Sequence, residues 1–255
     1  MPPPMTGSTI ALKVFHDGDH EDTRFERELY YMINKDRIAG DIVDNAFPFL
    51  PALGVDVRPM SYALGLPLVP GTLRGQLAKD GAFDELTGKS VGIQLAFGLE
   101  YLHTKRGVIH LDLKCQNILW NPFDGRAYII DFGMAEKVEE RRARRATYTT
   151  ANYRPPELWA PRPGWQALRP AADIWSFGAI MYEVFAGVML IPGSSERHVY
   201  ACLQLLGKAD AKQRARRFSV VPQPLQKAVA EMCAAQASSR PRASTLIETF
   251  SRRVA

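Results

Sequence analysis

The sequence predicts an α+β fold, with several short β-strands and a larger number of residues in helices. Strands are indicated by the apolar residues 8–15 and by the runs 117–120 and 127–130, which flank the turn sequence Asn-Pro-Phe-Asp-Gly. Helices are indicated by the apolar spacing of residues 90–104 and by the long apolar run 174–191. A chain of 255 residues can bury a sizeable core as one large domain or as two small lobes.

The composition is that of an ordinary globular protein. Hydrophobic residues make up 46% of the chain and charged residues 23%, which is typical of folded domains. The net charge of +5 is modest, and the arginine-rich residues 141–145 supply part of it. We interpret them as a solvated loop, so nucleic acid is not an expected partner.

Neither a secretory signal nor a membrane span is predicted. The first residues, MPPPMTGSTI, lack the basic and apolar regions of a signal peptide. Residues 174–191 approach transmembrane length, but Glu183 and two glycines interrupt them, so a buried helix explains them better. The three cysteines are unclustered and odd in number, which favours reduced thiols in a cytoplasmic or nuclear setting.

The functional signal is concentrated at one end of the predicted hairpin. Residues 110–117 (HLDLKCQN) precede its first strand, and residues 131–133 (DFG) follow its second. The hairpin therefore brings four chemical groups to the same end of a small sheet, namely those of Asp112, Lys114, Asn117 and Asp131. Phosphoryl transfer needs this set, because one carboxylate accepts the proton of the attacking hydroxyl while an amide and a second carboxylate hold Mg²⁺.

These segments resemble the catalytic and Asp-Phe-Gly segments of eukaryotic-type protein kinases. Further landmarks follow in the order of that family: Lys13 in Ala-Leu-Lys, Glu157 closing Tyr-Arg-Pro-Pro-Glu, and Asp173 opening Asp-Ile-Trp-Ser-Phe-Gly. Arg240 stands where the family's late arginine forms a structural pair with that glutamate. The resemblance implies a bilobal protein-kinase-like fold with a truncated small β lobe and a mostly helical large lobe.

The resemblance divides the chain at residue 65. Residues 1–65 would be a partial small lobe with the lysine strand, the regulatory helix and the hinge, and residues 66–255 would be the large lobe. The family places two strands and a glycine-rich loop before the lysine strand, whereas only MPPPMTG precedes it here. Either the gene model is clipped or the small lobe is incomplete, and an exposed sheet edge is expected in the second case.

The resemblance also implies roles for residues of the large lobe. Asp112 would orient the substrate hydroxyl and accept its proton, and Lys114 would offset charge on the γ-phosphate. Asn117 and Asp131 would bind the Mg²⁺ that accompanies ATP. Leu119 would form part of the floor beneath the adenine.

In the small lobe, the resemblance implies an ion pair that holds ATP. Lys13 would bind the α- and β-phosphates, and Glu28, on a helix predicted over residues 21–35, would pair with it. Glu26 on the same helix is the alternative partner.

A hinge resembling that of the family is expected at residues 60–65. Met60 would be the gatekeeper, and the backbone around Tyr62 and Ala63 would hydrogen-bond adenine. An internal stack linking the lobes is expected to consist of Met32, His110, Phe132 and Asp173.

Two expectations concern the activation segment. Leu111 stands where most members of the family carry the arginine that grips a phosphorylated loop, so we expect activity to depend weakly on phosphorylation at Thr147 or Thr149. Thr150 matches the threonine that contacts the catalytic aspartate and lysine.

The leading hypothesis is an ATP-dependent protein serine/threonine kinase that uses Mg²⁺, acts on a protein substrate, has a regulatory protein partner and does not associate with membranes. Lysine two residues after Asp112 resembles serine/threonine rather than tyrosine kinases, and residues 153–157 resemble the cyclin-dependent and mitogen-activated kinase group. One alternative is a pseudokinase that acts as a binding scaffold. Another is a small-molecule kinase of the aminoglycoside or choline type. The Ala-Pro-Glu-like segment and the late arginine argue against it, because those enzymes lack both.

Overall fold

The structure is a computed structural model, and it describes residues 10–16, 21–39, 48–51, 53–58, 61–138, 149–159 and 169–252. The first half of the chain contains β1 (Ile10–His16), α1 (Glu21–Ile38), β2 (Gly54–Arg58), β3 (Ser61–Pro67), β4 (Gly71–Thr72), α2 (Leu73–Asp80), α3 (Glu85–Glu100) and a π-helical turn (Tyr101–Lys105). The second half contains β5 (Val108–Ile109), β6 (Ile118–Asn121), β7 (Arg126–Ile129), β8 (Glu136–Lys137), α4 (Ala171–Ala186), α5 (Glu196–Lys208), α6 (Ala211–Phe218), α7 (Gln223–Met232) and α8 (Ala243–Ser251).

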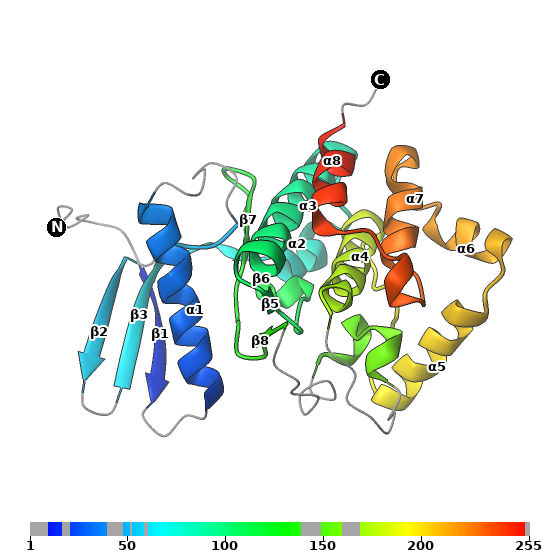
Figure 1. Cartoon of the computed structure of the whole chain (residues 1–255). Helices are drawn as coiled ribbons and strands as arrows, with labels where there is room; N and C mark the ends of the chain where they lie inside the picture. Colours follow the sequence, from blue (N-terminus) through cyan, green and yellow to red (C-terminus); the bar gives the residue numbers. More distant parts are fainter. Residues whose placement is uncertain are drawn as a thin grey trace.

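The strands β1 to β3 and the helix α1 form a small lobe, and the elements from β4 onward form a large lobe. The small-lobe sheet is antiparallel with the strand order β1-β3-β2, and Figure 1 shows it with α1 at one side of the molecule and the remaining helices at the other. In β1, Ile10, Leu12 and Val14 are exposed, whereas Phe15 is buried in the same cluster as Leu29 of α1. Alternating strand residues therefore anchor α1 on one face of the sheet.

The central strand of this sheet shows that the predicted hinge position was wrong. β3 pairs with β1 on one side and β2 on the other, so Tyr62 lies opposite both Phe15 and Val57. Because every N–H and C=O of a central strand points toward one neighbour or the other, the backbone groups of Tyr62 and Ala63 are committed to the sheet and not to adenine. Met60 lies outside the described residues.

The connection between the lobes lies further along the chain. β3 continues to Pro67 and β4 begins at Gly71, so residues 68–70 join the two lobes. The predicted division after residue 65 stays a prediction, and β3 runs across that position.

The hairpin predicted from residues 117–120 and 127–130 is confirmed, with each strand shifted by no more than one residue. β6 and β7 pair in antiparallel register from Ile118 opposite Ile129 to Asn121 opposite Arg126. β4 adds a third strand beside β6. The loop that precedes β6 and the segment that follows β7 therefore emerge at the same end of this sheet.

The prediction of a buried helix from the apolar run 174–191 is also confirmed. Every residue of α4 from 172 to 185 is buried, and the helix ends where Gly187 adopts a left-handed φ of 72°. A Cβ on Gly178 would come within 2.7 Å of the Cys233 sulfur, so glycine allows α4 to pack closely against the end of α7. Among the described helices, none is long and apolar enough to span a bilayer.

One hydrophobic core runs through both lobes. The same cluster of buried side chains includes Phe15 and Leu29 of the small lobe, Phe132 at the junction, and Phe177 and Phe250 of the large lobe. The junction between the lobes is therefore built around the segment that follows β7.

Candidate active site

The loop before β6 is held in place from α4. Asp173, which is 1% exposed, accepts the backbone N–H of His110 at 2.8 Å and that of Leu111 at 2.9 Å, and His103 Nε2 lies 2.8 Å from its carboxylate. Burial alone would raise the pKa of Asp173, but the contact with His103 and the other donors outweigh it and lower this pKa below its ordinary value. These bonds hold Leu111 at a φ of 66°, a left-handed conformation that a leucine adopts only when its surroundings impose it.

This loop brings together the predicted catalytic residues of the large lobe. The Asp112 carboxylate, in a residue 9% exposed, lies 2.6 Å from Lys114 Nζ and accepts a hydrogen bond from Asn117 Nδ2 at 3.1 Å. Thr150 donates its hydroxyl to Asp112 Oδ1 at 2.7 Å, and Lys114 Nζ donates to the Thr150 hydroxyl at 2.9 Å. The expected contacts of Thr150 are thus confirmed, and they fix the orientation of the Asp112 carboxylate.

The second carboxylate of the set lies at the end of β7. Asp131 adopts a φ of 68°, and one of its oxygens lies 3.9 Å from Lys13 Nζ of β1. Ile130 N donates to Asn117 O at 3.0 Å, which keeps the segment carrying Asp131 beside the loop carrying Asn117. Residues from β1, the loop before β6 and the end of β7 therefore meet where the two lobes join.

The partner of Lys13 is Glu26, so the prediction that Glu28 forms this ion pair was wrong and the alternative was right. Lys13 Nζ pairs with Glu26 Oε1, which also accepts the backbone N–H of Phe132 at 2.9 Å. Glu26 is 5% exposed, whereas Glu28 is exposed on the other side of α1. The face of α1 that meets the core is the physical reason, because residues 26, 29, 30 and 33 share it at helical spacing.

The internal stack forms with one change from the prediction. The Phe132 ring is fully buried, with its centroid 5.3 Å from the His110 ring and 5.1 Å from the Tyr30 ring. Tyr30 takes the place predicted for Met32, because it lies one turn after Glu26 in the corrected helical phase. His110 in turn bonds to Asp173 through its backbone, so the stack runs from α1 to α4.

The Leu119 side chain is partly buried, and Leu119 pairs with Thr72 across β6 and β4. This places it on the large-lobe sheet next to the start of α2, just past the connection formed by residues 68–70. Its predicted contact with adenine stays a prediction.

Two oxygen groups beside the catalytic loop suit a divalent cation. Asn117 uses its Nδ2 to donate to Asp112, and within the described residues its Oδ1 accepts no hydrogen bond. The Asp131 side chain is 49% exposed and therefore open to a ligand. Mg²⁺ prefers oxygen ligands and takes one or two from the protein when phosphate oxygens and water supply the rest, so this donor set fits the ion.

The position that carries an arginine in most kinases is apolar here. Leu111 is 4% exposed and packs in a small cluster with Ile109, Met134, Val138, Leu158 and Ala172. Thr149 is also buried, and its hydroxyl accepts a hydrogen bond from Arg154 Nε at 3.0 Å. Thr147 lies outside the described residues. Position 111 therefore offers no charge to a phosphorylated loop.

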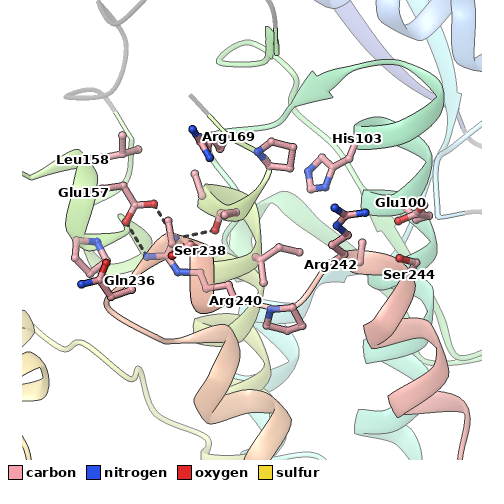
Figure 2. Close-up of a pocket in the computed structure, with 18 of the residues that line it drawn as sticks. Glu100, His103, Glu157, Leu158, Arg169, Gln236, Ser238, Arg240, Arg242 and Ser244 are labelled. Carbon is pink, nitrogen blue, oxygen red and sulfur yellow. Dashed lines mark hydrogen bonds and ion pairs between the residues drawn. The ribbon is translucent and has the colours of Figure 1, made fainter. Parts of the chain in front are cut away.

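The predicted structural pair of Glu157 and Arg240 is confirmed. The guanidinium of Arg240 binds both carboxylate oxygens of Glu157 at 2.7 Å, and Figure 2 shows this pair at the edge of a pocket. Arg240 also donates to the carbonyls of Ala171 and Ala234 at 2.8 and 2.9 Å. The pocket has a volume of about 1430 Å³, and its lining includes neither Asp112 nor Asn117.

Lys13 of a strand pairs with a helix glutamate, Asp112 is oriented beside a lysine, and Asn117 and Asp131 suit Mg²⁺. This is the set of groups that phosphoryl transfer requires. The chain belongs to the protein kinase family, because the family model described as Protein kinase domain matches residues 6–250.

Curated relatives carry the names of several kinds of kinase. The chain is 35% identical over 133 residues to cyclin-dependent kinase F-3 of Oryza sativa subsp. japonica, a match that covers 52% of this chain and 29% of the relative. It is 37% identical over 121 residues to 3-phosphoinositide-dependent protein kinase 1 of Homo sapiens, covering 46% of this chain and 21% of the relative. It is 34% identical over 139 residues to mitogen-activated protein kinase kinase kinase mkh1 of Cytospora mali, a match that covers 53% of this chain and 7% of the relative. The chain thus spans less than a third of the length of each of these three relatives.

Proposed function

We propose that this chain is an ATP-dependent protein serine/threonine kinase that transfers the γ-phosphoryl group of MgATP to a hydroxyl of a protein substrate. The observation that carries the proposal is the single network in which Lys114, Asn117 and Thr150 surround the Asp112 carboxylate. This network lies at the lobe junction together with the ion pair of Lys13 and Glu26.

In this proposal, each side chain acts on one part of the reaction. The substrate oxygen attacks the γ-phosphorus, the bond to the β–γ bridging oxygen breaks, and the hydroxyl proton passes to Asp112. Thr150 and Asn117 keep that carboxylate oriented, and the Lys114 ammonium offsets charge on the transferred group. Lys13 holds the α- and β-phosphates while Glu26 holds Lys13.

Mg²⁺, held by Asn117 and Asp131, would supply charge neutralisation on the phosphate oxygens. Adenine would lie over Leu119 and contact the connection at residues 68–70, since β3 is paired on both sides from Ser61 to Gly65.

Serine/threonine specificity rests on the lysine two residues after Asp112, and a cyclin-dependent kinase among the relatives supports the resemblance of residues 153–157 to that group. The same resemblance to the cyclin-dependent kinase group is the reason for including a regulatory protein partner in the proposal.

The alternative function is a pseudokinase that serves as a binding scaffold. One observation favours it: within the described residues, β1 pairs with a strand only on its β3 side. The intact catalytic network favours the kinase.

Phosphate transfer from radiolabelled MgATP to a mixed peptide library tests the proposal. Asp112→Asn is expected to lower the rate by about 10²- to 10⁴-fold, as loss of a general base does, while leaving the rise in melting temperature caused by MgATP in place. Absence of transfer by the wild type, together with no MgATP-induced rise in its melting temperature, would favour the scaffold.

A further inference from the structure

Helix α1 is attached to the large lobe near both of its ends. At one end, Glu26 accepts the backbone N–H of Phe132. At the other end, Asp36, which is 7% exposed, contacts residues that follow α3. The two carboxylates are separated by ten residues, or about 15 Å along the helix axis at 1.5 Å per residue. The second attachment can therefore control the direction of the helix that carries Glu26.

The contacts of Asp36 form a closed triangle with two large-lobe side chains. Tyr101 donates its hydroxyl to Asp36 Oδ2 at 2.6 Å, and Arg106 Nη2 pairs with the same oxygen. Arg106 Nε donates back to the Tyr101 hydroxyl oxygen at 2.9 Å. Lys105 Nζ lies 3.7 Å from the same carboxylate oxygen, and Arg106 Nη2 also reaches the carbonyl of Met32 at 3.4 Å. Four side chains thus tie the last turns of α1 to the large lobe.

This triangle depends on an irregular turn. α3 continues into a π-helical turn over Tyr101–Lys105, and Arg106 N donates to Tyr101 O, five residues earlier, at 3.2 Å. In an α-helix the side chain four residues after Tyr101 would share its face, whereas the wider turn places Arg106 there. The Arg106 guanidinium accordingly lies over the Tyr101 ring, 5.6 Å from its centroid. Single π-turns of this kind are frequent at functional sites.

We propose that Tyr101 and Arg106 are positioning residues, which hold Asp36 and so fix α1 in the orientation that brings Glu26 to Lys13. The proposal rests on the proposed kinase function and deepens it. A helix held only at the Phe132 contact could pivot there and withdraw Glu26. With Asp36 also held, α1 has two fixed points and the ion pair is preorganised.

The test replaces the ion pair of Asp36 and Arg106 by apolar side chains, so neither charge is left buried without its partner. The double variant Asp36→Leu/Arg106→Met removes both charges, and such replacements of buried pairs commonly preserve folding. We expect kcat/KM for MgATP to fall about 10- to 100-fold, the scale of a small misplacement of a catalytic group. Hydrogen exchange of the α1 amides should also become faster. The matched control is Glu231→Leu/Lys227→Met, which removes an exposed ion pair on α7 and should change neither quantity.

A second comparison separates positioning from general destabilisation. In a Glu26→Gln background, the double variant should cause no further loss of kcat/KM, because the group that it positions is already impaired. Losses that multiply, or an unchanged kcat/KM in the double variant alone, would overturn the proposal.

The exchange measurement does not depend on catalysis. A wild type that transfers no phosphate, together with faster α1 exchange in the variant, would refute the kinase function while leaving the attachment of α1 supported. Unchanged α1 exchange would overturn the attachment, whatever the activity.

Discussion

Replacing Glu26 by glutamine is expected to lower kcat/KM for MgATP by about 10- to 140-fold. The Glu26 carboxylate is 6% exposed and receives Lys13 Nζ and the backbone N–H of Phe132 on one oxygen. Glutamine keeps the shape and can still accept from Phe132, so the variant removes mainly the charge on the bond to Lys13. Hydrogen bonds to charged groups contribute about 1.5–3 kcal/mol, and each 1.4 kcal/mol corresponds to a factor of ten, which gives the stated range.

The assay is the initial rate of phosphate transfer at several MgATP concentrations, with a fixed protein substrate. Glu28→Gln is the matched control, since it makes the same chemical change two residues away at an exposed position of α1. It is expected to behave as the wild type. An equal or larger loss in Glu28→Gln than in Glu26→Gln would refute the assignment of the ion pair.

Three further results are expected. Arg240→Met should lower the free energy of unfolding by about 3–5 kcal/mol, because it leaves Glu157 without its partner. Denaturant unfolding measures this loss, and adding Glu157→Gln should recover part of it. Phosphatase treatment should lower activity only slightly, because Leu111 offers no charge to a phosphate. Near-complete inactivation would contradict this. Hydrogen bonds from Thr87 lower the pKa of Asp84. The contribution of Asp84 to the free energy of unfolding is therefore present above its unfolded pKa and is lost as the pH falls through the lower folded pKa. Asp84→Asn should flatten the acid side of the plot of unfolding free energy against pH, and an unchanged plot would contradict this.

The large-lobe half of the candidate site could be predicted because its determinants are local. Asp112, Lys114 and Asn117 lie within six residues, and the hairpin that follows brings Asp131 back beside them. A turn sequence between two apolar runs is enough to specify that geometry. The buried α4 was equally readable, since a helix that is apolar on all sides has to be buried.

The small-lobe half was predicted less well, for two physical reasons. The choice between Glu26 and Glu28 depends on helical phase, and Leu29 and Ile33 on the buried face could have decided it in favour of Glu26. The hinge was placed too early because residues 61–67 form a central strand, and pairing on both of its sides is not visible in one segment of sequence.

The contact between Asp36 and Arg106 could not be predicted at all. The two residues are 70 positions apart, and their meeting depends on the π-helical turn after α3. No local pattern in the sequence indicates such a turn.

The hydrophobic core contains Phe15 of the small lobe and Phe250 of the large lobe, and this bears on whether the two lobes can fold apart. Because buried rings near Phe132 belong to both lobes, we expect calorimetry to record a single cooperative heat-absorption peak. A fragment cut at the connection of residues 68–70 would leave apolar surface facing water on each half. Separate expression of the halves should therefore yield aggregates, and co-expression should be needed to recover a folded protein.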